Sequence, residues 1–429
     1  MTQPVATEIL RDNMRDARAR TLELVAGLDA EQLIGPKLAT VNPLQWEIGH
    51  VAWFYEYFIL RRIYGRDGLL ADGDTIYDSI AIAHDARWDL PLLGIADTLA
   101  YMAAVQDALL ERLEDGMAGV QDSYLYQFTT FHEDMHTEAY TYTRQCLGYR
   151  EPVFALASSD PEDGSAGPLP GDAAIPGGTF MFGNPKDAPF VFDNEKWAHP
   201  VTIAPFRMAR APVTIAEFAE FVDAGGYRTA EFWDDEGWRW RCSAGAAHPV
   251  YWLRDGPANW GMRRFDQTID LPPHQPVIHV NWYESSAWCR WAGRRLPSEA
   301  EWEFAATGGG AAQKRACPWG DDAPGPGRAN LDGRALGCID VAARAAGDSR
   351  HGCRQMIGNV WEWTQSTFEP FAGFAPDDYK EYSTTLFGVT KVLRGGAWPT
   401  RGRMVDSTYR NYFGPDRRDV LAGFRTCAI

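Results

Sequence analysis

The chain has 429 residues, of which 45% are hydrophobic and 23% charged, values typical of a soluble globular protein with more than one domain. The net charge of −17 repels phosphate backbones and argues against nucleic-acid binding. No apolar run approaches the length needed to cross a bilayer, and the N-terminal residues lack the pattern of a signal peptide. We therefore expect a cytoplasmic protein with neither a nucleic acid nor a membrane as partner.

The first part of the chain shows the periodicity of amphipathic helices. Apolar residues recur at helical spacing in four stretches, residues 6–33, 42–65, 95–115 and 122–147. In the second stretch Asn42 suits a helix cap, Pro43 suits the first turn, and Gly65 suits the end. Four helices with one apolar face each predict a four-helix bundle over residues 1–153.

The composition changes after this predicted bundle. Residues 154–174 are rich in Pro, Gly, Ser and acidic residues, which predicts a linker or a segment draped over the surface. Over residues 175–429, short apolar runs with many Gly, Pro and Trp residues predict a second, α+β domain with little regular structure. Two short helices are expected within residues 283–306, the second with a capping box formed by Ser298 and Glu301. The predicted fold class is multidomain, α followed by α+β.

Two residue types are informative by their number. The seven cysteines are odd in number, scattered, and free of any C-x-x-C pair, so we expect free thiols rather than disulfides or a structural zinc site. The seventeen tryptophans are unusually many, and their indole N–H groups need hydrogen-bond partners. This number predicts a loop-rich, hydrogen-bonded fold in part of the chain.

One stretch specifies chemistry by its spacing. His132 and His136 are four residues apart, so on a helix they lie on one face about 6 Å from each other, close enough to bind one metal ion. That face is mostly apolar and is expected to point into a core, where an unpaired imidazole is costly. His50 lies on the apolar stripe of the second predicted helix and also faces the core. The alternative to a metal site is a pair of hydrogen-bonded core histidines.

The same stretch also satisfies the H-E-x-x-H pattern of zinc proteases, with Glu133 as the group that would activate water. A protease of this type needs a third ligand downstream. Residues 137–141 lack the glycine and the third histidine of the metzincin continuation. A zinc protease is therefore the weaker interpretation of this motif.

Seven short segments in the second half carry a family resemblance. In chain order they are Ile175–Phe180, Pro212–Thr214, Arg295–Glu303, Pro318–Gly320, Gly358–Trp363, Leu393–Trp398 and Gly423–Arg425. With these segments the second half resembles the formylglycine-generating-enzyme (sulfatase-modifying factor) family, whose domain is C-type-lectin-like. The first half resembles DinB-like four-helix bundles, with His50, His132 and His136 at that family's three metal-ligand positions. The pairing of the two domains is similar to the ergothioneine-pathway sulfoxide synthases and the related selenoneine synthases.

This resemblance implies a non-heme iron enzyme. In the family, three histidines hold Fe(II), O₂ is consumed, and a C–S or C–Se bond forms at ring carbon 2 of hercynine, a trimethylated histidine betaine. Three neutral imidazoles leave the full charge on the metal and open positions for the sulfur or selenium donor and O₂. A tyrosine of the second domain serves as proton and hydrogen donor. Tyr379 matches its position, with Tyr382 beside it.

The resemblance also implies which residues bind hercynine. Residues 410–418 match the segment that lines the family's substrate pocket. Tyr412 and Phe413 can offer aromatic faces to the quaternary ammonium, and Asn411 can reach the betaine carboxylate. Met135, between the two helix ligands, stands where mycobacterial-type enzymes carry a glutamine that touches the substrate.

Two departures from the family concern the chalcogen donor. Where enzymes that use γ-glutamylcysteine have an arginine before the third helix, the alignment places His84, with Arg87 close by. Where they have an acid for the donor's amino group, this chain has Phe413, and Arg417 alone remains of the charged clamp. Losing an arginine and an acid together favours another donor, because Arg–carboxylate pairs are strong and geometrically demanding. We expect a neutral selenosugar, with cysteine or γ-glutamylcysteine as the alternative thiol donors.

Two further functions share the fold of the second domain. Formylglycine generation uses a cysteine pair shortly after the Gly-Gly-aromatic segment, whereas Trp398 is followed by residues 399–403 without cysteine. A non-catalytic binding module is the other alternative, since lectin-like folds often only bind. The three histidines together with Tyr379 argue against such a module.

Overall fold

The computed structural model describes residues 4–114, 119–157, 166–188, 190–255, 259–309 and 314–429. The chain forms two compact units. The first comprises Met1–Phe154 and Asp187–Phe190, and the second comprises Ala155–Lys186 and Val191–Ile429. Of the predicted linker, residues 158–165 lie outside the described residues. Residues 172–174, assigned to the same linker from composition, instead belong to a strand.

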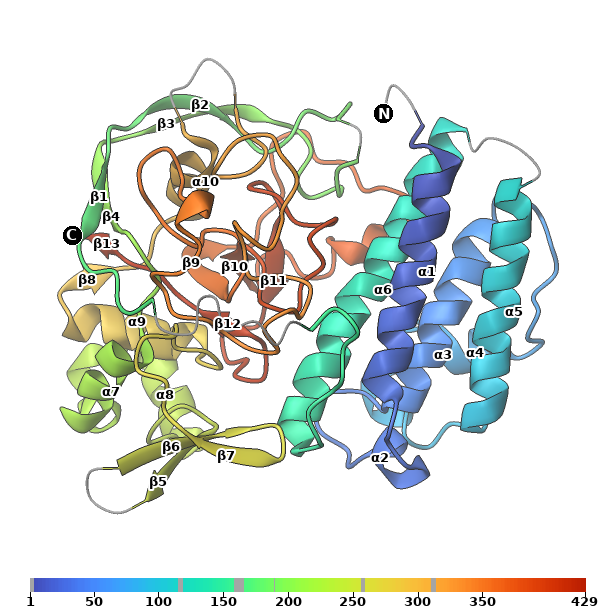
Figure 1. Ribbon diagram of the computed structural model, residues 1–429, viewed down its shortest axis with the longest axis horizontal. Coiled ribbons are helices and arrows are strands. Elements are labelled where there is room, and N and C mark those ends of the chain that lie inside the picture. The colour runs from blue at the N-terminus through green and yellow to red at the C-terminus, as the bar shows by residue number, and fades with distance from the viewer. Residues whose placement is uncertain (1–3, 115–118, 158–165, 189, 256–258, 310–313) are drawn as a thin grey trace. The chain divides into compact units, whose positions relative to one another are not determined.

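The first unit is built from helices (Figure 1). Their bounds are α1 Thr7–Val25, α2 Ala30–Ile34, α3 Leu44–Tyr55, the π-helix η1 Glu56–Arg61, α4 Gly73–Tyr77, the 3₁₀ turn η2 His84–Ala86, α5 Ile95–Glu114 and α6 Val120–Leu147. The four long helices α1, α3, α5 and α6 run side by side, and α3 contacts both α5 and α6. Every residue of α3 is buried, as expected for a helix that packs on several sides. The predicted four-helix bundle is confirmed.

Two details of these helices differ from the sequence prediction. The expected first helix is interrupted, because Gly27 adopts a left-handed backbone with φ of 74° and Asp29 begins α2 with its own capping box. Asn42 does not cap α3. The N-cap residue is Pro43, and Asn42 instead donates through Nδ2 to Glu47 Oε1 at 3.2 Å.

The second unit is α+β. Its strands are β1 Asp172–Ile175, β2 Gly178–Phe182, β3 His199–Ile203, β4 Phe206–Ala209, β5 Trp252–Asp255, β6 Asn259–Arg264, β7 Gln267–Asp270, β8 Arg294–Arg295, β9 Trp361–Thr367, β10 Lys391–Arg394, β11 Asn411–Phe413, β12 Ala422–Gly423 and β13 Cys427–Ala428. Its helices are α7 Ile215–Asp223, α8 Asp235–Ser243, α9 Trp282–Trp291 and α10 Glu299–Thr307, with 3₁₀ turns η3 Gly226–Arg228, η4 Ala230–Phe232, η5 Ala345–Gly347 and η6 Lys380–Tyr382.

The strands form small sheets joined by long loops, as Figure 1 shows. The strand orders are β1-β4-β13-β8, β11-β10-β9-β12, β2-β3 and β5-β6-β7. All pairs are antiparallel except β12 with β9. The capping box predicted for the second short helix is confirmed, because Ser298 accepts from the Glu301 N–H and the Glu301 side chain accepts from the Ser298 N–H.

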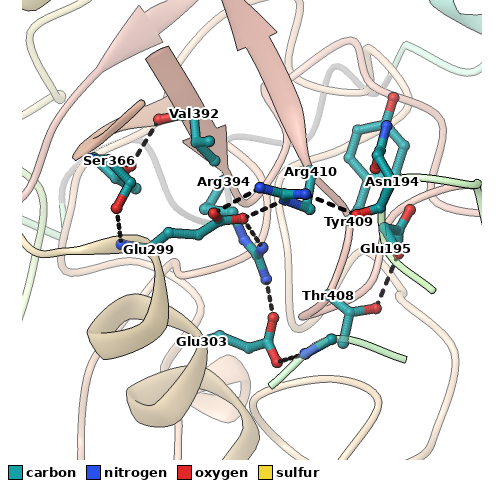
Figure 2. Close-up of polar contacts among 12 residues, drawn as sticks. Asn194, Glu195, Glu299, Glu303, Ser366, Val392, Arg394, Thr408, Tyr409 and Arg410 are labelled. Atoms are coloured by element: carbon teal, nitrogen blue, oxygen red, sulfur yellow. Dashed lines mark hydrogen bonds and ion pairs between the residues drawn. The ribbon is translucent and has the colours of Figure 1, made fainter. Parts of the chain in front are cut away.

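Ion pairs occupy the buried core of the second unit (Figure 2). Arg394 binds Glu299 at 2.8 Å and Glu303 at 2.7 Å. Arg410 makes a two-point contact with Glu299, through Nε at 2.7 Å and Nη2 at 3.0 Å. Buried charges of this kind persist only when every one is paired. The cluster therefore ties α10 and β10 to the residue that precedes β11.

Tryptophans and cysteines behave as expected for a loop-rich fold. Trp302 donates to Glu362 Oε2 at 2.7 Å, and Trp363 donates to the Val280 carbonyl at 2.9 Å. All seven cysteines are free. Within the described residues, no helix has both the length and the apolar character of a bilayer-spanning segment.

Candidate metal centre

Three histidines converge within the first unit. His50 comes from α3, and His132 and His136 come from successive turns of α6. Their ligand nitrogens all lie within 4.8 Å of one another, and the ring centroids are between 4.6 and 5.1 Å apart. Met135 precedes His136 on α6 and is half-buried. The structure thus gathers the three predicted ligands at one point.

Two polar groups orient the imidazole rings. His50 Nδ1 lies 2.8 Å from the carbonyl oxygen of Tyr77, and His136 Nδ1 lies 3.1 Å from Glu47 Oε1. Each contact favours the proton on Nδ1, so that Nε2 keeps its lone pair for a metal. Gly49 allows the close approach of Tyr77 to α3, because a Cβ at this position would overlap the Tyr77 ring.

The surroundings keep two of the rings neutral. Burial lowers the pKa of both His50 and His132 well below the usual value, and the neighbouring His136 lowers both further. Aromatic side chains hold the rings in place: Trp46 stacks on His50 at 4.9 Å and Phe54 stacks on His132 at 3.6 Å between centroids. Neutral imidazole is the form that donates a lone pair to a metal ion.

This donor set fits a divalent transition metal. The buried Nδ1 atom of His132 has no hydrogen-bond partner among the described residues. A core histidine held only by hydrogen bonds would have this atom satisfied, since buried polar groups are almost always paired. The geometry therefore favours metal coordination over the alternative of hydrogen-bonded core histidines.

Glu133 does not reach this centre. Its buried carboxylate accepts hydrogen bonds from Arg18 Nε at 2.9 Å and Thr21 Oγ1 at 2.7 Å, both on α1. Successive helix positions differ by about 100°, so Glu133 faces α1 while His132 faces α3. A zinc protease needs this carboxylate beside the metal, and the geometry excludes that alternative.

The loop residues assigned to the donor site lie differently from the sequence prediction. His84 turns to the backbone, with Nε2 at 2.8 Å from the Val41 carbonyl oxygen. The Arg87 guanidinium instead lies 4.0 Å from the centre of the Trp46 ring, and Trp46 is the residue that stacks on His50. Arg87, rather than His84, thus brings its side chain toward the histidines. Arg87 therefore stays a candidate for the position of the family's arginine.

The predicted catalytic tyrosine belongs to the second unit. Tyr379 directly precedes the turn η6 and is half-buried, as is Tyr382. The Tyr382 carbonyl oxygen accepts a hydrogen bond from the Tyr412 hydroxyl, and Ser383 donates to Asp193. These contacts anchor the segment directly after Tyr379 to β11 and to the loop that contains Asp193.

Three predicted hercynine-binding residues, Asn411, Tyr412 and Phe413, make up β11. Asn411 Oδ1 accepts from the Tyr412 N–H at 2.9 Å, which leaves the amide NH₂ of Asn411 able to donate to a carboxylate. The Tyr412 ring stacks on Phe368 with centroids 3.9 Å apart, so one of its faces is covered. The Tyr382 ring also lies near the Tyr412 ring, with centroids 6.0 Å apart in an edge-on arrangement.

Phe413 and Arg417, the residues considered for the donor clamp, lie close together. The Phe413 ring lies 5.2 Å from the Arg417 guanidinium. Arg417 itself binds Asp419, with Nε 2.7 Å from Oδ1 and a second contact through Nη2. The positive charge of Arg417 is therefore already neutralised by a carboxylate two residues away.

Comparisons with known proteins agree with this architecture. Residues 157–428 match the family described as Sulfatase-modifying factor enzyme 1-like domain, and residues 13–139 match the DinB superfamily. The hercynine oxygenase of Mycolicibacterium thermoresistibile is 38% identical over 440 residues, covering 98% of this chain and 95% of that protein. The hercynine oxygenase of Mycobacterium tuberculosis is 37% identical over 439 residues and covers 99% of each chain. The chain belongs to the hercynine oxygenase family.

Membership in the hercynine oxygenase family settles three predictions. It confirms the resemblance to the ergothioneine-pathway sulfoxide synthases that the motifs carried. It confirms the fold class, a DinB-like helical bundle followed by a sulfatase-modifying-factor domain. It also confirms that the chain is an enzyme of the oxidoreductase class.

The chain is also similar, over part of its length, to formylglycine-generating enzymes. The enzyme of Streptomyces coelicolor is 32% identical over 255 residues, covering 53% of this chain and 78% of that protein. Near the C-terminus Cys427 is fully buried in β13, and burial raises its pKa to about 12. A buried neutral thiol of this kind is unreactive, so the formylglycine alternative gains no support from it.

Sequence reasoning missed the groups that orient the histidines. Glu47 stands three residues before His50 on the same helix, and this i, i+3 spacing was a usable signal. The Tyr77 carbonyl left no signal, because any residue type supplies a backbone oxygen. Arg87 was noted only as a neighbour of His84, since its direction depends on contacts with Trp46.

Proposed function

We propose that this chain binds Fe(II) through His50, His132 and His136 and uses O₂ to form a C–Se or C–S bond at ring carbon 2 of hercynine. The observation that carries the proposal is the convergence of three imidazoles from α3 and α6. The naming of the full-length relatives as hercynine oxygenases supports the choice of substrate.

The residues around the histidines suit this metal. Fe(II) held by three neutral imidazoles would keep its full charge and open coordination positions for hercynine, the chalcogen donor and O₂. Glu47 fixes the His136 ring through Nδ1, and the Tyr77 carbonyl does the same for His50. Trp46 stacks on His50 and Phe54 stacks on His132, and both of these imidazoles are buried.

In this proposal the Tyr379 phenol would serve as the proton and hydrogen donor at the substrate site, and the iron, when bound, would supply the O₂ chemistry. A phenol can serve as such a donor only from a fixed position. Contacts just after Tyr379 provide that constraint, through Tyr382 with Tyr412 and through Ser383 with Asp193.

Hercynine is proposed to bind through its two charged ends. In this proposal Asn411 donates from its amide NH₂ to the carboxylate, and the ring of Tyr412 receives the trimethylammonium group on the face opposite Phe368. Met135, beside the ligands on α6, contacts the imidazole with its apolar side chain.

The donor is proposed to be a neutral selenosugar. Phe413 offers no carboxylate to the amino group of a donor, and leaving such a charge buried without an acid costs several kcal/mol. Arg417 is neutralised by Asp419 and is not a free partner for a donor carboxylate. A sugar needs only hydrogen bonds for its hydroxyl groups.

Arg87 favours a second candidate, in which the donor is γ-glutamylcysteine or cysteine. Its guanidinium lies over Trp46 near the histidines, where it could bind a donor carboxylate. The two candidates therefore assign donor selection to different residues. Phe413 favours the selenosugar, and Arg87 favours γ-glutamylcysteine or cysteine.

A donor competition decides between the candidates. The enzyme is loaded with Fe(II) and hercynine without air, each donor is supplied with O₂, and products are identified by mass. We expect kcat/KM for the selenosugar to exceed that for γ-glutamylcysteine at least about tenfold, equivalent to roughly 1.4 kcal/mol. Phe413→Asp should narrow this gap, and Arg87→Gln should leave sugar turnover nearly unchanged. Efficient use of γ-glutamylcysteine alone, lost in Arg87→Gln, would establish the second candidate instead.

A further inference from the structure

A pocket of about 320 Å³ lies in the second unit against one face of α9. Trp282, Cys289 and Arg290 line it from α9, Arg294 and Arg295 from β8, and Lys391 from the start of β10. This volume is at the lower end of the range for small-molecule sites, so it suits a metabolite rather than a macromolecule. None of these residues belongs to the proposed metal or hercynine sites.

The lining of the pocket is cationic and contains no acidic side chain. Two of its four cations are neutralised from outside the lining. Arg294 binds Asp172 at 2.8 Å, and Arg295 makes a two-point contact with Glu301 at 2.7 and 2.8 Å. The positive charges of Arg294 and Arg295 are therefore already paired with carboxylates.

The other two cations have weaker compensation than Arg294 and Arg295. Arg290 forms only a long ion pair with Asp234, with Nη2 3.7 Å from Oδ2, a separation too large for a hydrogen bond. Among the described residues, no carboxylate lies within 4.0 Å of the Lys391 ammonium, which donates to Thr367 Oγ1 at 3.0 Å and lies 4.5 Å from the centre of the Trp282 ring.

Lys391 is held in a place that is costly for a cation. Burial lowers its pKa, and the more distant Glu236 and Asp234 only partly oppose this effect. A bound anion would stabilise this half-buried, weakly compensated ammonium. The whole chain, by contrast, has a net charge of −17 and repels anions. The local charge is thus opposite in sign to that of the whole molecule.

Neutral donors complete the site. Ser286 and Gln365 also line the pocket, and neither side chain donates to another described residue. Two cations and two neutral donors suit an anion that offers several oxygens at once. A phosphate monoester has three terminal oxygens and up to two charges, whereas a single carboxylate has two oxygens and one charge.

We propose that this pocket binds a phosphate monoester of metabolite size, with its phosphate between Lys391 and Arg290 and its hydrogen bonds completed by Ser286 and Gln365. The remainder of the ligand lies along the pocket wall, where the Trp282 ring is. This binding is independent of the Fe(II) site.

Calorimetric titration of the full-length, metal-loaded chain tests the proposal. Glycerol 3-phosphate, inorganic phosphate, malonate and glycerol are titrated at constant ionic strength. We expect saturable binding of glycerol 3-phosphate, weaker binding of malonate, and none of glycerol. Lys391→Gln and Arg290→Gln should each weaken glycerol 3-phosphate binding at least about tenfold, as expected for removal of a charged hydrogen-bond donor.

Arg350→Gln is the matched control, because Arg350 is an exposed arginine of the same unit outside the pocket lining. It should bind glycerol 3-phosphate like the parent. Melting temperature and metal content are measured for all variants, and the exposed Arg290 provides a variant that leaves the fold intact if Lys391→Gln does not. Binding that persists in both pocket variants, at the metal for example, would overturn the proposal. Malonate binding as tight as that of glycerol 3-phosphate would do the same.

Discussion

Glu47 is the charged residue that connects α3 to one of the metal-binding histidines. It is 2% exposed, and its Oε1 faces His136 Nδ1 at 3.1 Å. We expect Glu47→Ala to weaken Fe(II) binding about 10- to 100-fold, because groups that orient a metal ligand typically contribute that much. Competition with a chromogenic chelator measures the affinity.

Two variants make the Glu47 experiment specific. Glu47→Gln keeps an oxygen acceptor for His136 and should recover most of the affinity. Glu111→Gln removes an exposed carboxylate from α5 and should change nothing. Equal Fe(II) affinity in Glu47→Ala and the parent would show that His136 needs no such support.

Tyr379 can be tested by removing one atom. Tyr379→Phe deletes only the hydroxyl, so hercynine binding should persist while product formation falls about a hundredfold, within the range for loss of a positioned proton donor. Single-turnover experiments with mass detection of the product measure this. Undiminished product from Tyr379→Phe would remove that residue from the mechanism.

Single residues were predictable where a helix fixes their direction. The spacing of His132 and His136 and the apolar stripe around His50 placed all three correctly toward one point. His84 and Arg87 lie in a loop, where tertiary contacts set the direction of each side chain. His84 is turned to a backbone carbonyl and Arg87 to an indole ring, and neither contact leaves a periodic pattern in the sequence.

At the scale of elements, β11 depends on the ion-pair cluster of Figure 2. Arg410 directly precedes this strand, is 2% exposed, and binds Glu299 and the Asn194 carbonyl. Arg410→Met should lower the free energy of unfolding of the second unit by about 3 to 5 kcal/mol, because it leaves a buried carboxylate with fewer partners. Urea unfolding followed by tryptophan fluorescence measures the change.

The exposed pair of Arg328 and Asp322 provides the control for Arg410. Its atoms are also close, at 2.8 Å, but the side chains are 35% and 77% exposed. Arg328→Met should therefore change stability by less than about 1 kcal/mol. Similar losses in both variants would mean that burial of the Arg410 cluster adds nothing.

Helices and strands were predictable where the pattern that specifies them lies within neighbouring residues of the sequence. The long helices of the first unit and the capping box at Ser298 follow from periodicity and from adjacent side chains. The break at Gly27 was missed, since the apolar pattern continues across it. Strand order was not predictable, because β12 and β13 have two residues each and pair with strands distant in sequence.

At the scale of the whole molecule, Glu195 makes the free energy of unfolding depend on pH, and the direction of this dependence can be worked out. Burial raises the pKa of this carboxyl to about 8, with Asp406 adding to the effect. Between the unfolded pKa of about 4.5 and about 8, the folded state holds a proton that the unfolded state lacks, so Glu195 makes stability fall as pH rises. Glu195→Gln should remove this loss and gain a few kcal/mol relative to the parent between pH 5 and 8.

His279 changes stability with pH in the opposite direction, so its contribution must be separated from that of Glu195. Burial lowers its pKa to about 4, so it makes stability fall as pH drops below about 6.5. The comparison of parent and Glu195→Gln at each pH cancels the His279 contribution, since both proteins contain it. A constant stability difference across the whole pH series would show that Glu195 is ionised in the folded protein.

The segment Asp187–Phe190 belongs to the helical unit although the chain has already entered the second one. Phe190 lies 5.2 Å from Tyr124 and 4.8 Å from Phe131, both on α6, and Phe131 is 5% exposed. A gene divided after residue 154 would therefore yield a bundle without one of its own packing residues. If two related genes recombined at that junction, the bundle of one protein would have to pack against the Asp187–Phe190 segment of the other. The helical unit therefore depends on residues from both halves of the gene.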